Sequence, residues 1–288
     1  MASLFLIQIG CTHDITDEYY LEEKTVINSF LKHGEPAYFE ITTNYKTMPE
    51  FRIYNGGELS LFENGRFIEK QRSLNRRVEF NSIINVSSEY FIEFKSDNGD
   101  ILSATTNCGK PIENLSISID TFLRNPEFGY YYPVLLLEMD NPIGNDYFEL
   151  GGTYYYRRNK NDKRLWSRNL TFGAQQTFAL DSIYNTNIFT DSTFENRTIK
   201  QKIYPEHVVS SNTKEWVSDT FFYSISVRNI SFSYYQYQRT KFLHRYNQDG
   251  DFFTGNSSAS PVYSNIKGGL GIFGGFYEVK DSIIVVKP

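Results

Sequence analysis

The chain of 288 residues is long for one sandwich and comfortable for two domains. Aromatic residues make up 17% of it, with 24 Phe and 22 Tyr against 3 Met, which favours pleated sheets and argues against a helical bundle. The net charge of -5 gives no general attraction to phosphate backbones, so a nucleic-acid partner is not expected.

The chain opens with a short apolar run, residues 4–9, that ends at Gly10 and Cys11 and is followed by a polar, acidic stretch. This order is typical of a secretory signal with a lipoprotein cleavage point, where the thiol of Cys11 takes a diacylglycerol. We therefore expect residues 1–10 to be a signal lead and residues 11–23 a tether. No basic residue precedes the run, which is consistent with a start upstream of Met1. A frayed terminus or first strand with a buried Cys11 is the alternative.

Residues 24–108 show period-two alternation of apolar and polar side chains, interrupted by turn sequences. Clear examples are residues 37–42, 58–62 and 89–94. About seven strands fit into this length, which is the size of an immunoglobulin-like or transthyretin-like β-sandwich. Residues 109–114 are then expected to be a linker. Cys108 is the only cysteine after Cys11, so no intrachain disulfide is expected in the mature chain.

Residues 115–288 are predicted to form a larger β-rich domain. Strands are expected at residues 115–120, 133–139, 146–157, 170–180 and 219–230. One helix is expected near residues 231–246, with Ser231 as its cap. Its aromatic and aliphatic stripe would face the core and consists of Tyr235, Phe242, Leu243 and Tyr246. The predicted fold class is therefore all-β and mostly antiparallel.

Residues 269–274 match the G-x-G-x-x-G pattern of nucleotide-binding loops. Only fourteen residues follow Gly274, which leaves no room for the βαβ unit that such a loop serves. We expect instead a glycine-permitted crossing, in which Leu270, Ile272 and Phe273 fill the core while bare backbone passes close to another strand. The glycines of this motif are Gly268, Gly269, Gly271, Gly274 and Gly275.

A basic run lies in residues 157–168, with six cations against one acid and an indole among them. It is expected either as a solvated hairpin tip or as a contact site for an anionic lipid headgroup or an acidic partner loop. The residues proposed for such a contact are Arg157, Arg158, Lys160, Lys163, Arg164 and Trp166.

The sequence shows few signatures of catalysis or metal binding. The four histidines form no short metal-ligand spacing, and there is no G-x-S-x-G elbow. Residues 247–251 resemble half of a calcium loop but lack its ligand spacing and closing Glu, so a helix-to-loop turn is favoured. We expect no catalytic residues, metal or cofactor.

Three stretches resemble the domain-of-unknown-function family 4249: residues 260–275, residues 140–148, and the N-terminal order of cysteine, strand at residues 25–28 and Gly34-Glu35-Pro36. The resemblance covers nearly the whole chain from Cys11 onward. It implies a surface or outer-membrane lipoprotein of a Bacteroidota-type envelope, often encoded beside TonB-dependent transporters, with an Ig-like first half and a β-rich second half. It places the lipidated cysteine at Cys11 and carries over no catalytic or ligand residue. In such envelopes Ser182 and Ser282 resemble acceptors of O-glycans.

These observations predict a non-catalytic, lipid-anchored binding protein of the cell envelope, exposed at the outer membrane. It would assist a TonB-dependent outer-membrane transporter by presenting substrate or by covering the mouth of the transporter. A structural or adhesive surface protein is the alternative, and an envelope hydrolase is a third hypothesis. The sequence does not identify a small-molecule, peptide or glycan ligand.

Overall fold

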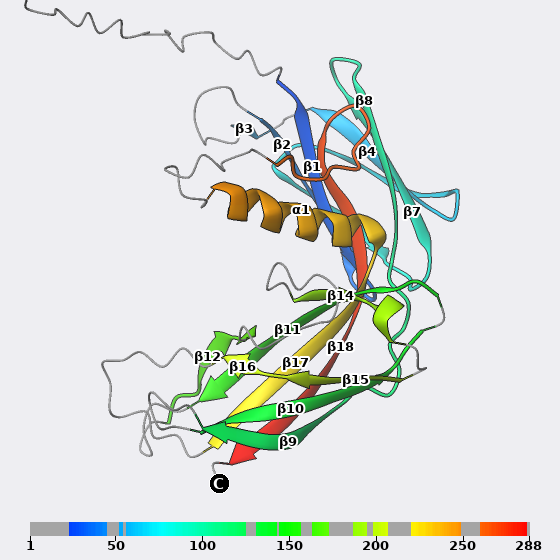
Figure 1. Cartoon of the computed structure of the whole chain (residues 1–288). Coiled ribbons are helices and arrows are strands. Elements are labelled where there is room, and N and C mark those ends of the chain that lie inside the picture. Colours follow the sequence, from blue (N-terminus) through cyan, green and yellow to red (C-terminus); the bar gives the residue numbers. More distant parts are fainter. Residues whose placement is uncertain are drawn as a thin grey trace, which may run out of the picture.

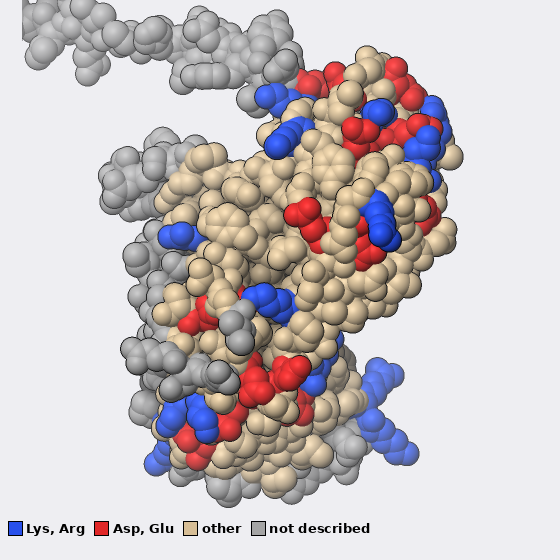
Figure 2. Space-filling model, turned by 90° about the vertical axis from the view of Figure 1, so that its right-hand side faces the viewer, with Lys and Arg blue, Asp and Glu red and all other residues tan. Residues whose placement is uncertain are grey.

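The computed structural model describes residues 23–44, 52–53, 56–124, 131–142, 144–156, 163–172, 187–194, 198–206, 220–248 and 260–286. The described part is all-β with one α-helix, which confirms the predicted fold class. Its strands form two sandwiches that lie end to end (Figure 1). Lys and Arg are interspersed with Asp and Glu over the face that Figure 2 shows, so this face carries no large area of a single sign.

The first sandwich contains β1 to β8. One of its sheets holds β1 (Thr25–Lys32), β2 (Pro36–Thr43), β3 (Arg52–Ile53) and β6 (Arg77–Ile83). The facing sheet holds β5 (Arg66–Arg72), β4 (Gly57–Glu63), β7 (Glu89–Ser96) and β8 (Ile101–Asn107). Alternate side chains of these strands point inward, as the sequence pattern predicts, and Ile27, Phe39 and Phe94 are fully buried in one core.

The second sandwich is built from the rest of the chain. Its larger sheet holds β11 (Tyr147–Tyr156), β12 (Trp166–Asn169), β14 (Ile188–Thr190), β17 (Thr220–Ile230) and β18 (Leu270–Val286). The facing sheet holds β9 (Ser116–Arg124), β10 (Tyr131–Asp140) and β15 (Thr198–Ile203). A small pair, β13 (Thr171–Phe172) and β16 (Pro205–Glu206), and the 3-10 turn η1 (Asp191–Thr193) complete it. Leu135, Leu150 and Tyr223 are fully buried in its core.

The long strand β18 belongs to both sandwiches. Its first part pairs in parallel with β1, from Val26↔Leu270 to Lys32↔Phe276. Its second part pairs with β17 in antiparallel, from Ile230↔Phe276 to Thr220↔Val286. Phe273 is accordingly buried in the first core and Val285 in the second. Strands from before and after the linker expected at residues 109–114 therefore belong to one continuous sheet (Figure 1).

Close backbone approach explains the glycines at the start of β18. Gly271 has φ +117°, and a Cβ there would lie 2.1 Å from the carbonyl oxygen of Ile27. Cβ atoms at Gly268, Gly269 and Gly275 would also lie within 3 Å of backbone oxygens, whereas one at Gly274 would lie 3.1 Å from the Cβ of Tyr234. The segment thus passes unusually close to the backbone of its neighbours.

Two of the three residues of this segment that were expected in the core are buried, and one is not. Ile272 and Phe273 are fully buried, as expected. Leu270 is 38% exposed, so its predicted core position is wrong. Leu270 is the first residue of β18, at the end of the strand, whereas Ile272 lies two residues farther into the sheet and is fully buried.

Helix α1 (Phe232–Gln248) covers the outward face of the sheet at the junction of the two sandwiches (Figure 1). Ser231 caps it as predicted, because its Oγ accepts a hydrogen bond from the backbone N–H of Tyr234 at 3.3 Å. Tyr235 is buried as expected, and Tyr234 is buried beside it, with its ring centroid 4.5 Å from that of Phe30 on β1. Phe242 and Leu243 are half-buried, so the helix is held mainly by its first turns.

The close contact at Gly271 generates a prediction. Gly271→Ala is expected to lower the free energy of unfolding by more than about 3 kcal/mol, because the added methyl group meets backbone and the positive φ is strained. Gly34→Ala is the matched control, since Gly34 also has a positive φ of +78° but open space around it. It should cost about 1–2 kcal/mol. Equal losses in chemical denaturation would contradict the role assigned to the close approach.

Candidate functional site

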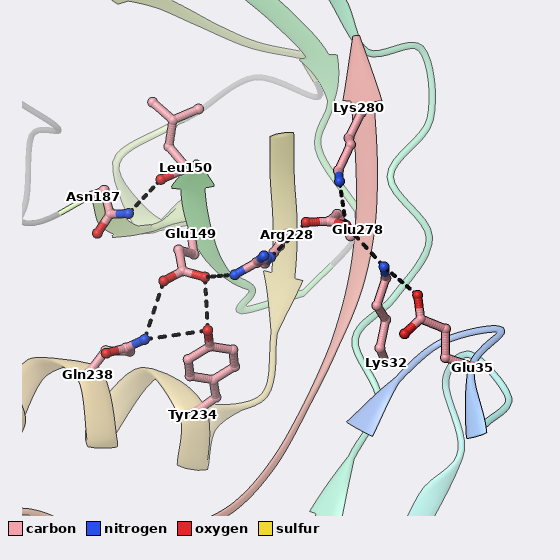
Figure 3. Close-up of polar contacts among 10 residues, drawn as sticks. All are labelled: Lys32, Glu35, Glu149, Leu150, Asn187, Arg228, Tyr234, Gln238, Glu278 and Lys280. Carbon is pink, nitrogen blue, oxygen red and sulfur yellow. Dashed lines mark hydrogen bonds and ion pairs between the residues drawn. The ribbon is translucent and has the colours of Figure 1, made fainter. Parts of the chain in front are cut away.

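A row of charges, two buried carboxylates and a half-buried guanidinium, crosses the outward face of the large sheet just beyond α1. Glu149 on β11 is the register partner of Arg228 on β17, and Arg228 is the partner of Glu278 on β18. Figure 3 shows these three side chains pointing toward one another from adjacent strands. We call Glu149, Arg228 and Glu278 the charged row. Because paired residues lie on the same face of a sheet, strand register alone brings the three together.

The guanidinium of Arg228 joins the two carboxylates. Its Nη1 lies 2.8 Å from Glu149 Oε2, and its Nε lies 2.9 Å from Glu278 Oε1. Two side chains of α1 bind the same glutamate: the hydroxyl of Tyr234 donates to Glu149 Oε2 at 2.9 Å, and the amide of Gln238 donates to Oε1 at 3.3 Å. The charged row therefore attaches the helix to the sheet.

The other end of the charged row reaches the first sandwich. Lys32 Nζ, at the end of β1, lies 3.3 Å from Glu278 Oε2 and 2.6 Å from Glu35 Oε1 (Figure 3). Lys280 adds a second cation at 3.3 Å from Glu278 but is largely exposed. The polar chain thus runs from α1 through three strands of the second sandwich to the first turn of the first sandwich.

Electrostatics hold these groups in their ordinary charge states at neutral pH. Burial opposes the charge of Arg228, but attraction by Glu149 outweighs burial and raises the pKa of Arg228. Burial likewise works against ionisation of Glu278, yet the charge of Arg228 prevails and the pKa of Glu278 is lowered. Burial raises the pKa of Tyr234, and the charge of Glu149 raises it further. None of these three pKa values moves toward neutrality, as a general acid or base would require.

A second polar cluster holds the segment between the sandwiches in place. Lys110 Nζ lies 2.8 Å from Asp146 Oδ2, and the amide of Asn229 donates to Asp146 Oδ1 at 3.1 Å. Asn229 Oδ1 accepts from the backbone N–H of Lys110 at 3.0 Å. Burial raises the pKa of the neighbouring Asp191, and the charge of Asp146 contributes to the rise. The stretch at residues 140–148 therefore fixes the expected linker through Asp146.

The residues proposed from the sequence are distributed over several places. Cys11, Arg157, Arg158, Lys160 and Ser182 lie outside the described residues. Lys163 and Arg164 are exposed just before β12, whereas Trp166 lies within β12 and packs against the core of the second sandwich. Ser282 is exposed in β18. The structure brings none of these described residues into the charged row.

The half calcium loop at residues 247–251 lies only partly within the described residues. Asn247 and Gln248 end α1, and residues 249–251 lie outside the described part. Within the described ranges, no group of three or more His, Cys, Asp or Glu side chains is placed to hold a metal ion. The same part of the chain contains no helix with the length and apolarity needed to cross a membrane.

The charged row has no signature in the sequence. Glu149, Arg228 and Glu278 each occupy an outward position of an alternating strand, where a solvated charge is the ordinary expectation. Their residue numbers are 79 and 50 apart, and only the strand order β11-β17-β18 makes them neighbours. Strand order cannot be obtained from alternation alone.

Comparison with known proteins identifies the family. A family model described as "Domain of unknown function (DUF4249)" matches residues 12–282. No curated protein matches the chain. The matched range includes the stretches around Asp146 and the glycines of β18, whose structural roles are described above.

The charged row predicts a specific dependence of stability on pH. Arg228→Met is expected to lower the free energy of unfolding at pH 7 by about 3 kcal/mol, because it removes the cation that joins Glu149 to Glu278 and leaves Glu278 with Lys32 and the exposed Lys280. In the native protein the lowered pKa of Glu278 contributes stability above about pH 4.5, and this contribution is lost as the pH falls. In the variant, loss of the Arg228 charge would move the pKa of Glu278 upward, because burial is then opposed only by Lys32 and Lys280. The difference in the free energy of unfolding between the native protein and Arg228→Met should therefore become smaller as the pH falls.

Denaturant titrations at pH 7 and at about pH 4 measure this difference, because the contribution of Glu278 is lost below about pH 4.5. Lys280→Met is the control, since it removes a cation from the same carboxylate at an exposed position and should cost less than about 1 kcal/mol. A loss in Arg228→Met that is independent of pH would contradict the electrostatic role of the charged row.

Proposed function

The chain belongs to the DUF4249 family, and we propose that it is a non-catalytic binding protein of the cell envelope, anchored by a lipid on Cys11. In this proposal it sits at the surface of the outer membrane and assists a TonB-dependent transporter. The observation that carries the proposal is the shared strand β18, which makes one elongated body of both sandwiches. This body begins at β1, shortly after Cys11 in the sequence.

In this proposal the position of Cys11 limits how far the start of β1 can lie from the membrane. Thirteen residues separate Cys11 from Thr25, the first residue of β1. Fully extended, such a segment spans at most about 50 Å. A lipid on Cys11 would therefore keep the start of β1 within about that distance of the membrane. A tethered body of this kind is suited to reaching a neighbouring membrane protein.

The chemistry of the described residues supports recognition over reaction. The buried ionisable groups are engaged in ion pairs and hydrogen bonds that join strands, helix and linker. Burial raises the pKa of the Cys108 thiol to about 11, so that the thiol is a poor nucleophile at neutral pH. Cys108 instead donates a hydrogen bond to the backbone oxygen of Phe276 at 3.2 Å.

The lipid anchor generates a test of the proposed function. Cys11→Ser is expected to release the full-length protein from membranes, because the acyl chains supply the membrane affinity. A tagged wild-type protein, isolated from gently solubilised membranes, should co-purify with a large outer-membrane transporter, and the variant should lose it. Quantitative mass spectrometry of both preparations measures the two effects.

Cys108→Ser is the matched control, since it changes the other cysteine without touching the anchor. It should retain both membrane attachment and the partner. An unlipidated wild-type chain in the cytosol, or isolation as a lone monomer with unchanged nutrient uptake on deletion of the gene, would refute the proposed function.

A further inference from the structure

Strands β1 and β18 start at the same end of the molecule but finish at different places. In their parallel pairing, Val26 near the start of β1 lies opposite Leu270, the first residue of β18. β1 ends at Lys32, near the junction of the sandwiches, whereas β18 continues to Val286 at the far end of the second sandwich (Figure 1). A pull that holds the start of β1 and draws the end of β18 away therefore acts along both strands, in opposite directions.

The direction of a pull decides how the hydrogen bonds between these strands are loaded. The bonds of a parallel ladder are evenly spaced along the strands and run across them. An axial pull, along the strands, loads all of the bonds together, because none can open before the strands slide. A lateral pull, across the strands, opens the ladder one bond at a time from its end. The ladder from Val26↔Leu270 to Lys32↔Phe276 should therefore resist an axial pull far better than a lateral one.

Side-chain contacts add to the resistance of this interface to sliding. Within the ladder, Asn28 Oδ1 accepts a hydrogen bond from the backbone N–H of Ile272 at 3.2 Å. Just beyond the ladder, Lys32 Nζ lies 3.3 Å from Glu278 Oε2. Both contacts join β1 to β18, so the strands cannot slide past each other without breaking them.

Of the two strands, β18 is held more extensively. Its second part pairs with β17 over the whole length of that strand. Beside its first part, the side chain of Asn265 accepts from the backbone N–H of Phe273 at 2.9 Å and donates to the backbone oxygen of Phe273 at 2.8 Å. Among the described strands, β1 pairs with β18 and, over Thr25–Asn28, with β2. Extraction of β1 is thus the smaller rupture, and we expect it to set the axial force.

We propose that the pairing of β1 with β18 is a mechanical clamp, which carries an axial pull from one sandwich to the other without separating them. The clamp consists of the parallel ladder and the contacts Asn28–Ile272 and Lys32–Glu278. The load passes through the junction because β18 belongs to both sandwiches. The clamp goes beyond the proposed function and does not require a lipid on Cys11.

Single-molecule force spectroscopy compares the two directions of pull on the same protein. Handles at Glu23→Cys and Val286→Cys pull along the strands, whereas handles at Glu23→Cys and Lys267→Cys pull the starts of β1 and β18 apart. All three positions are exposed. Both proteins are full-length and carry Cys11→Ser, and the remaining thiol, that of Cys108, is buried away from the handles.

At one loading rate, the axial pull should require about three times the force of the lateral pull or more, because forced unfolding reports the barrier that the load must cross. Equal forces in the two directions would overturn the clamp.

Asn28→Ala tests whether sliding of β1 along β18 sets the axial force. It removes the acceptor of the Ile272 N–H and should lower the axial rupture force. Asn64→Ala is the matched control, since Asn64 Oδ1 also accepts a backbone N–H, that of Glu89 at 3.0 Å, but lies in the turn between β4 and β5. Asn64 has φ +49°, so alanine there should lower the equilibrium stability as well. It should nevertheless leave the axial force unchanged.

Denaturant titrations of both variants give their equilibrium losses, which separates a change in the clamp from general destabilisation. A lower axial force in Asn28→Ala alone supports the clamp. An axial force that falls equally in both variants, or in neither, would assign the resistance to another part of the fold and overturn the proposal.

Discussion

The pairing of β18 with β1 on one side and β17 on the other is the constraint on which the structure depends. Hydrogen bonds run from Leu270 to Val286, so a single strand supplies a partner to each sandwich. Phe273 and Val285 place side chains of this strand in the two cores. The sandwiches consequently share a sheet. Helix α1, the charged row and the linker at residues 109–114 all lie where β18 passes from one sandwich to the other.

The sequence predicts the local features well because they follow from local chemistry. Alternation identifies the inward faces of strands such as β4 and β7, and Ser231 identifies the start of α1. The glycines before and within β18 indicate close backbone approach. Glycine is nevertheless depleted in strands, so the same residues predict a short crossing of the chain. The structure instead has a continuous strand of 17 residues. Here the proximity of Ile27 determines the residue type, and only the tertiary structure reveals that neighbour.

The charged row was beyond prediction for a different reason. It consists of residues that are unremarkable one by one and acquire meaning from strand order. Glu149 and Glu278 meet Arg228 because β17 lies between β11 and β18. Alternation says which face of a strand a residue occupies, whereas the order of the strands in the sheet decides which residues become its neighbours.

The parallel pairing of β1 with β18 has a consequence for how the molecule is made. Asn28 and Ile272, joined by a side-chain hydrogen bond of 3.2 Å, are 244 residues apart in the chain. Contacts of such high contact order form slowly, because a long loop must close before they contribute. A nascent chain emerging from a ribosome or a translocation channel has the edge of β1 unpaired until residue 276 is available. Until then that edge presents unpaired backbone groups, and such an edge invites pairing with another chain.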